Sequence, residues 1–188
     1  MSPVTHFLFG WMVANAARLD RRERAAVAIA GVIPDVDGLG AVPEALTAGT
    51  QHPITWFSDY HHMLHNVFFA LAVALIAFAI ARQRFKTALL VFLSFHLHLF
   101  CDVLGARGPD GHQWPIPYFL PFSSWEGTWS GQWALNSWPN FAITGALLAV
   151  TFYLAWRRSF SPLEIVSQRA DRAFVGAIHQ RFPAPAGS

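Results

Sequence analysis

Residues 88–104 read ALLVFLSFHLHLFCDVL, and this stretch decides the fold. It is apolar over nearly the length of a bilayer crossing, which needs about 20 residues, yet it contains His98 and Asp102. Two more apolar runs occupy residues 67–81 and 141–156. Each of the three runs is slightly shorter than a bilayer crossing requires, but flanking aromatic residues and arginines can supply the missing helical turn. The sequence therefore predicts three long transmembrane helices.

The composition agrees with a membrane protein. Of 188 residues, 54% are hydrophobic and only 13% are charged, against about a quarter charged in soluble domains. This excludes a disordered chain. The basic residues fall in short clusters between apolar runs, so the net charge of +2 does not indicate a nucleic-acid partner. The single cysteine, Cys101, excludes an intramolecular disulfide.

The two ends of the chain predict shorter helices. Residues 4–17 and 25–33 are apolar and flank a basic turn, which predicts a helical hairpin of short spans or re-entrant helices. Ser161 and Glu164 have the spacing of a capping box before an amphipathic stretch. We therefore expect an all-α integral membrane bundle at 1–158, and at 159–188 a cytoplasmic amphipathic helix with a disordered tail.

Basic residues predict the orientation. They cluster at 18–24, 82–86 and 157–158, and such clusters favour the cytoplasmic side of short loops. Every histidine except His179, and most carboxylates, then lie toward the opposite face. The sequence therefore predicts a multi-pass membrane protein with its site on the extracytoplasmic face.

The apolar run at 88–104 also carries the strongest chemical signal. His98 and Asp102 are four residues apart and share one helix face, while His96 lies roughly opposite His98. Ionisable groups in a membrane segment are costly unless they are paired or bind a metal. This pair predicts either two metal ligands or a hydrogen bond that joins helices.

Further candidates lie in two other segments. Either His61 or His62 can face one ion together with His65, because these spacings match a helical turn, although a metal-free histidine cluster is an alternative. Asp35 and Asp37 lie in a Pro-Asp-Val-Asp-Gly turn, where aspartates either cap the backbone or offer oxygen ligands. Five of the eight tryptophans lie between residues 114 and 138, which predicts an interfacial aromatic belt or a lid over the site.

Together these residues predict a metal centre. His6 and His112 are weak candidates singly, but they complete a set of eight on one side. The ligands that we favour are His6, Asp37, His65, His98 and Asp102. Asp35 is a ligand or the base that orients water, His112 a ligand or the acid that protonates the leaving oxygen, and His61 a further ligand candidate. Mixed imidazole and carboxylate donors suit zinc, with manganese or iron as alternatives.

The order of the motifs resembles that of bacterial membrane-bound metal-dependent hydrolases of the inner membrane. The matching motifs, within residues 1–155, are Thr5-His6, Pro34-Asp35-Val36-Asp37, a histidine cluster ending in His65-Asn66, His98-x-x-x-Asp102, and Pro121-Phe122-Ser123. The order is distantly similar to that of zinc-dependent phospholipases C and related single-strand nucleases, all-helical enzymes with three zinc ions. Their late His-x-x-x-Glu has no counterpart here, since no histidine precedes Glu126 by four residues. Two ions are therefore expected rather than three.

The resemblance implies a phospholipase-like hydrolase that cleaves a phosphoester of a lipid or lipid-linked substrate with a metal-activated water. The sequence has no Gly-x-Ser-x-Gly elbow, which would indicate a serine nucleophile, and no glycine-rich loop, which would indicate a bound nucleotide. The alternatives are a non-enzymatic haem- or metal-binding membrane protein, and a structural protein whose polar residues bond only to each other.

Overall fold

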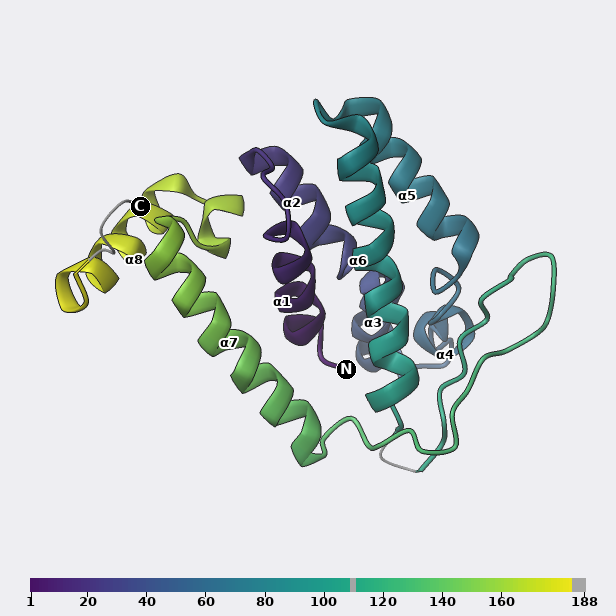
Figure 1. Ribbon diagram of the computed structural model, residues 1–188. Coiled ribbons are helices and arrows are strands. Elements are labelled where there is room, and N and C mark those ends of the chain that lie inside the picture. Colours follow the sequence, from purple (N-terminus) through teal and green to yellow (C-terminus); the bar gives the residue numbers. More distant parts are fainter. Residues whose placement is uncertain (109–110, 184–188) are drawn as a thin grey trace.

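The computed structural model describes residues 1–108 and 111–183, and within them the regular elements are all helices, with two isolated β-bridges in the non-helical segments (Figure 1). The all-α prediction is thus confirmed. The elements are α1 Pro3–Ala14, α2 Arg21–Ala30, the 3-10 helix η1 Ile33–Gly40, α3 Ala41–Thr47, α4 Trp56–Tyr60, α5 Val67–Ile80, α6 Arg84–Gly105, α7 Trp138–Arg158, the 3-10 helix η2 Pro162–Ile165, and α8 Gln168–Arg181.

Two helices are long and apolar enough to cross a membrane, α6 with 22 residues and α7 with 21. At 1.5 Å per residue each exceeds the apolar thickness of about 30 Å. The run at 67–81 forms α5, a helix of only 14 residues, so a third long span stays a prediction. Helix α2 and the segment Ile33–Thr47 pass the same test as a pair, but they are bent by 52°. The spans or re-entrant helices expected near the N-terminus also stay predictions.

Small residues let α1, α2 and α6 approach one another closely. A Cβ on Gly10 would lie 2.7 Å from the Ala28 carbonyl oxygen and 2.9 Å from Ser94 Oγ. A Cβ on Gly31 would lie 2.7 Å from the His6 carbonyl oxygen. These distances are shorter than van der Waals contact, so side chains at either position would force the helices apart. The close crossing brings the start of α1 beside the C-terminal half of α6.

Helix α7 packs on α1 and leaves most of its apolar side chains exposed. Where the two helices meet, the hydroxyls of Thr5 and Thr144 form a hydrogen bond of 2.7 Å. At the other end of α7, Arg158 donates to the Asn15 carbonyl oxygen at 2.9 Å. Exposed apolar side chains along a helix of this length are typical of a lipid-facing surface.

The cap expected at Ser161 is present in part. Ser161 caps the 3-10 helix η2, because its side chain accepts from the Leu163 amide, but the amphipathic helix α8 begins only after Ser167, whose side chain accepts from the Ala170 amide. The Glu164 carboxylate instead binds the Arg24 guanidinium, with distances of 2.7 and 2.8 Å. A two-point ion pair is stronger than one capping hydrogen bond, so Glu164 joins η2 to α2. The expected tail lies outside the described residues, apart from Pro183.

Candidate metal centre

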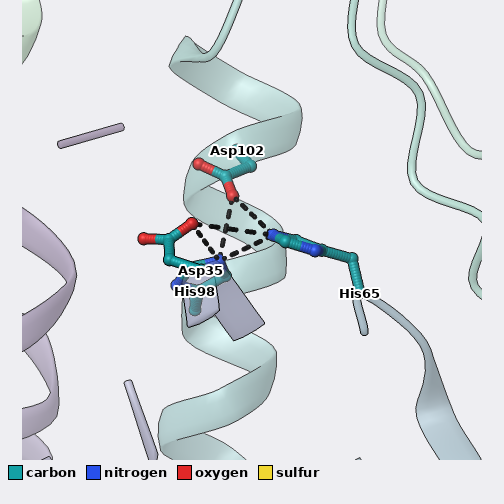
Figure 2. Close-up of side chains that lie close together, drawn as sticks. All are labelled: Asp35, His65, His98 and Asp102. Carbon is teal, nitrogen blue, oxygen red and sulfur yellow. Dashed lines mark hydrogen bonds and ion pairs between the residues drawn. The ribbon is translucent and has the colours of Figure 1, made fainter. Parts of the chain in front are cut away.

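Four side chains from three separate segments meet near the C-terminal end of α6. Asp35 comes from η1, His65 from the loop before α5, and His98 and Asp102 from α6 (Figure 2). One donor atom from each lies within 4.8 Å of the others. His65 is 0% exposed and His98 is 1% exposed. A mixed set of two imidazoles and two carboxylates at this separation matches the ligand chemistry of a divalent cation.

The two histidines of α6 lie on different faces of the helix, as the helical periodicity predicts. His98 Nε2 lies 3.0 Å from Asp102 Oδ2, one turn along the same face. His96 lies on another face, where its ring nitrogens contact the Phe92 carbonyl oxygen at 2.8 Å and the Tyr118 hydroxyl at 2.9 Å. His96 therefore takes no part in the group of four.

Backbone and carboxylate contacts orient both histidines of the group. His98 Nδ1 donates to the Gly31 carbonyl oxygen at 2.9 Å, and His65 Nδ1 lies 3.6 Å from Asp37 Oδ2, within ion-pair range but without a hydrogen bond among the described residues. Both rings therefore turn Nε2 inward, as in the carboxylate–histidine–metal arrangements of metalloproteins. The two Nε2 atoms lie only 3.2 Å apart, a distance at which a shared proton or a cation relieves the repulsion of their lone pairs.

Asp35 provides a further sign that the group fits a cation. Its Oδ1 lies 3.6 Å from His98 Nε2 and 3.8 Å from His65 Nε2. Its Oδ2 is buried and has no hydrogen-bond partner in the described chain. A buried carboxylate oxygen without a donor is costly, and a bound cation would remove that cost.

Asp37, expected to be a ligand, lies behind His65 instead of in the group of four. Its Oδ1 contacts His61 Nδ1 at 3.0 Å and its Oδ2 accepts from the Leu64 amide at 3.1 Å. His61 is thus also directed at Asp37. The two aspartates differ because residues two apart on a 3-10 turn point in different directions. Asp37 and His61 hold the loop that presents His65.

The carboxylates around His65 change its protonation. Burial opposes the charged form of this imidazole, but contacts with Asp35 and Asp37 outweigh burial and raise the pKa of His65 to about 9. Burial and the neighbouring His65 and His61 lower the pKa of His62 to about 3. Without a metal, His65 therefore carries a proton at neutral pH and His62 does not.

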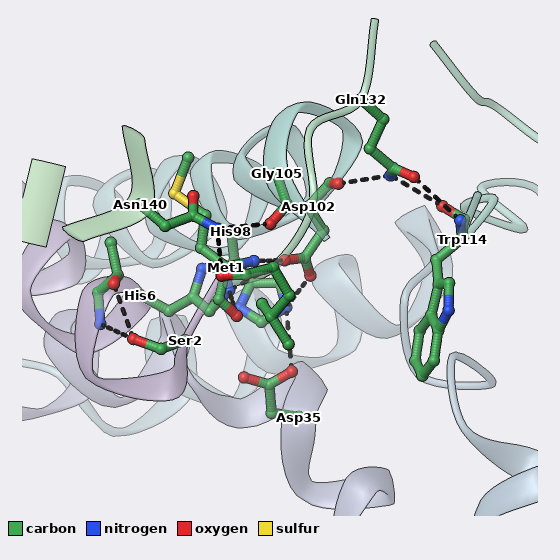
Figure 3. Close-up of polar contacts among 12 residues, drawn as sticks. Met1, Ser2, His6, Asp35, His98, Asp102, Gly105, Trp114, Gln132 and Asn140 are labelled. Carbon is green, nitrogen blue, oxygen red and sulfur yellow. Dashed lines mark hydrogen bonds and ion pairs between the residues drawn. The ribbon is translucent and has the colours of Figure 1, made fainter. Parts of the chain in front are cut away.

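His6 and the amino group of Met1 contact the other oxygen of Asp102 (Figure 3). His6 Nε2 lies 3.0 Å from Asp102 Oδ1, and its ring packs on that of His98 with centroids 3.8 Å apart. Asp102 therefore faces His98 with one oxygen and His6 with the other. The contacts from Met1 N and the Gly31 carbonyl could not be read from residue types, because they come from the main chain.

Two amides fix the end of α6 that carries the group. Gln132 donates to the Asp102 carbonyl oxygen at 2.8 Å, and Asn140 donates to the Gly105 carbonyl oxygen at 2.9 Å (Figure 3). The last carbonyls of a helix have no partner within the helix. These side chains satisfy two of them and thereby tie α6 to the segment before α7, through Gln132, and to the first turn of α7, through Asn140.

A cavity of about 350 Å³ adjoins the group of four. Its polar side includes Asp35, Asp102, His61 and His62, and its apolar walls include Leu39, Phe57, Trp114 and Leu135. The His61 ring stacks on Phe57 with centroids 4.4 Å apart. Trp114, from the tryptophan-rich segment, is thus a wall of the cavity. Polar groups at one side and apolar walls at the other suit an amphiphilic ligand.

His112 is not brought into the group. It lines a separate hollow together with Arg107 and Glu126. Of the eight residues predicted for the centre, four form the group, His6 contacts it through Asp102, and Asp37 and His61 support His65.

Comparison with known proteins identifies the family but no activity. A family model described as YdjM inner membrane protein matches residues 1–171. No curated protein and no solved structure matches the chain. The family match agrees with the two helices that are long enough to cross a bilayer. The chain is therefore a membrane protein and belongs to the YdjM inner membrane protein family.

Proposed function

We propose that this protein is a membrane-bound metal-dependent hydrolase that cleaves a phosphoester of a lipid or lipid-linked substrate. The observation that carries the proposal is the meeting of Asp35, His65, His98 and Asp102 at the edge of a cavity with apolar walls. A site that only joined helices would have no need of an adjoining cavity. The clustering of basic residues at 18–24, 82–86 and 157–158 supports an extracytoplasmic position for the site.

The donor set supports zinc, with manganese or iron as alternatives, and we propose two ions. The first position is the group of four. The second is beside His6 Nε2 and Asp102 Oδ1, where the Met1 ammonium now provides a positive charge. A divalent cation in such a site neutralises phosphate charge and lowers the pKa of a coordinated water toward about 7.

The protein's own residues have distinct roles in this proposal. Asp35 lines the cavity and belongs to the group of four, so it would serve either as a metal ligand or as the base that orients water. Phe57 and Trp114 line the same space and would shield a bound substrate from bulk water. The role of His112 as acid stays a prediction, and its place in a separate hollow means that His112→Ala should retain metal.

The apolar walls favour a lipid substrate over a soluble phosphoester. Leu39, Phe57, Trp114 and Leu135 would contact the apolar part of a substrate whose phosphate faces Asp35 and Asp102. The cavity lies at the end of α6, a candidate span, so a lipid could enter from the bilayer without leaving it. A nucleic acid has no comparable route.

The decisive experiment measures metal content and headgroup release on the same detergent-purified samples. His98→Ala and Asp102→Ala should lose most bound zinc and all headgroup or phosphate release from a phospholipid panel. His96→Ala is the matched control, because it removes a histidine of the same helix outside the group, and it should keep both. Full zinc and activity in His98→Ala and Asp102→Ala would refute the site.

The same experiment separates the proposal from a metal carrier. A carrier would hold stoichiometric metal in the wild type and release no headgroup from any lipid in the panel. Haem is disfavoured by the donor set, since haem iron takes at most two axial protein ligands, whereas four donors that include two carboxylates converge here.

A further inference from the structure

A second polar site lies at the end of the bundle opposite the metal centre. It is a hollow of about 620 Å³ between the α1–α2 turn and the C-terminal end of α7, lined by Arg18, Arg24, Arg157 and Arg158, with Asn15 and Phe160. We call it the arginine basin. Helix α1 runs from the metal centre, at Met1 and His6, to the basin, at Asn15 (Figure 1). Its 12 residues span about 18 Å.

The basin carries positive charge that the protein does not neutralise. Arg24 is paired with Glu164, and its charge is compensated. Arg157 and Arg158 are exposed and use one nitrogen each to bind neutral oxygens, of Tyr153 at 2.9 Å and of Asn15 at 2.9 Å. Arg18 is exposed as well, and among the described residues no carboxylate lines the basin. A guanidinium has five donors, so most donors face the hollow or solvent.

An apolar groove continues from the basin along α7. The groove, about 570 Å³, lies between α7 and α8 and is lined mainly by Phe152, Trp156, Phe174 and Ile178. Tyr153 lines this groove and accepts the hydrogen bond from Arg157, which lines the basin one helical turn later. A charged hollow and an apolar groove are thus adjacent on one face of α7.

We propose that the arginine basin binds the phosphodiester of an anionic phospholipid while the groove between α7 and α8 holds an acyl chain. Arginine recognises phosphate oxygens in pairs, and basic clusters at the end of a membrane helix attract anionic lipids. Free phosphate would use only the basin, whereas the adjoining groove matches an acyl chain. The lipid belongs to the leaflet opposite the metal centre and is not the substrate proposed above.

The test is lipid binding to the full chain in detergent, measured by native mass spectrometry with dioleoylphosphatidylglycerol and dioleoylphosphatidylcholine. Wild type should prefer the anionic lipid. Arg18→Gln/Arg157→Gln should weaken binding of the anionic lipid by about thirtyfold, the loss expected for two interfacial arginines. Arg82→Gln/Arg84→Gln, which removes the same charge from the exposed α5–α6 turn, is the matched control and should bind like wild type.

Two further measurements keep the result specific. Zinc content of Arg18→Gln/Arg157→Gln should equal that of wild type, which shows that the variant folds. Inorganic phosphate at millimolar concentration should not displace the lipid. Equal binding of both lipids, an equal loss in the control variant, or displacement by phosphate would each overturn the proposal.

Discussion

Asp102 connects the group of four to His6 through a single carboxylate. Oδ2 lies 3.0 Å from His98, and Oδ1 lies 3.0 Å from His6. Its residue is 5% exposed, so its charge depends on these partners. Asp37 has a different role, because its contacts are with His61, the Leu64 amide and the outer nitrogen of His65.

Asp37→Asn should therefore weaken metal binding without abolishing it. The substitution removes the charge behind His65 Nδ1, and the loss of such supporting contacts costs about 10- to 100-fold in affinity. Asp102→Asn should cost far more, because it removes a donor of the group itself. Competition with a zinc chelator measures both, and equal losses would show that Asp37 binds the metal directly.

Metal binding should release a proton from His65 at neutral pH. The raised pKa of about 9 means that the metal-free imidazole is protonated at pH 7, and a metal binds only the neutral ring. Apparent affinity should rise about tenfold per pH unit from pH 7 toward 9, and then level off. Calorimetry in buffers of different ionisation enthalpy counts the protons, and no release at pH 7 would contradict the assignment.

At the scale of elements, the close crossing of α1, α2 and α6 positions His6, His98 and Asp102 beside one another. Gly10 and Gly31 have backbone atoms of the neighbouring helices so close that a Cβ would meet them at 2.7 Å. His6 lies one turn before Gly10 on α1. The spacing of these helices and the contact between His6 and Asp102 are thus coupled.

Gly10→Ala should destabilise the protein by about 1–3 kcal/mol, the usual cost of overpacking. Gly145→Ala is the matched control, because Gly145 lies in α7 and its Cβ would meet nothing within 4 Å. The control should be neutral or slightly stabilising, since alanine favours helix. Thermal unfolding in detergent compares them, and equal midpoints would show that the crossing tolerates a wider spacing.

At the scale of the whole molecule, the metal centre and the arginine basin lie at opposite ends of α1 (Figure 1). The basin gathers two of the three basic clusters that predict the cytoplasmic side. If that prediction holds, the centre opens to the extracytoplasmic side. The two sites would then contact different leaflets of one bilayer.

Labelling of single cysteines in intact cells tests this orientation. Gln51 lies in the exposed segment after α3, and Gln180 is exposed on α8. Gln51→Cys should react with a membrane-impermeant maleimide in intact cells, and Gln180→Cys only after permeabilisation. The native Cys101 is 1% exposed and should give little background. The reverse pattern would place the metal centre in the cytoplasm.

The sequence by itself determined the features that depend on local periodicity. The long apolar runs specified the helices α6 and α7, and the spacing of four placed His98 and Asp102 on one face, because helix geometry is the same in every context. The same rule placed His96 elsewhere. The run at 67–81 likewise specified α5, which ends at Ile80, just before the polar residues 82–84.

Only the tertiary structure decided which of the remaining candidates reach the metal centre. Asp35 belongs to the group of four while Asp37 does not, and His65 belongs while His61 does not. In each pair the residues are chemically alike and close in sequence. The direction in which each side chain points depends on how η1 and the loop before α5 pack against α6. Such contacts between distant segments leave no periodic signal in the sequence.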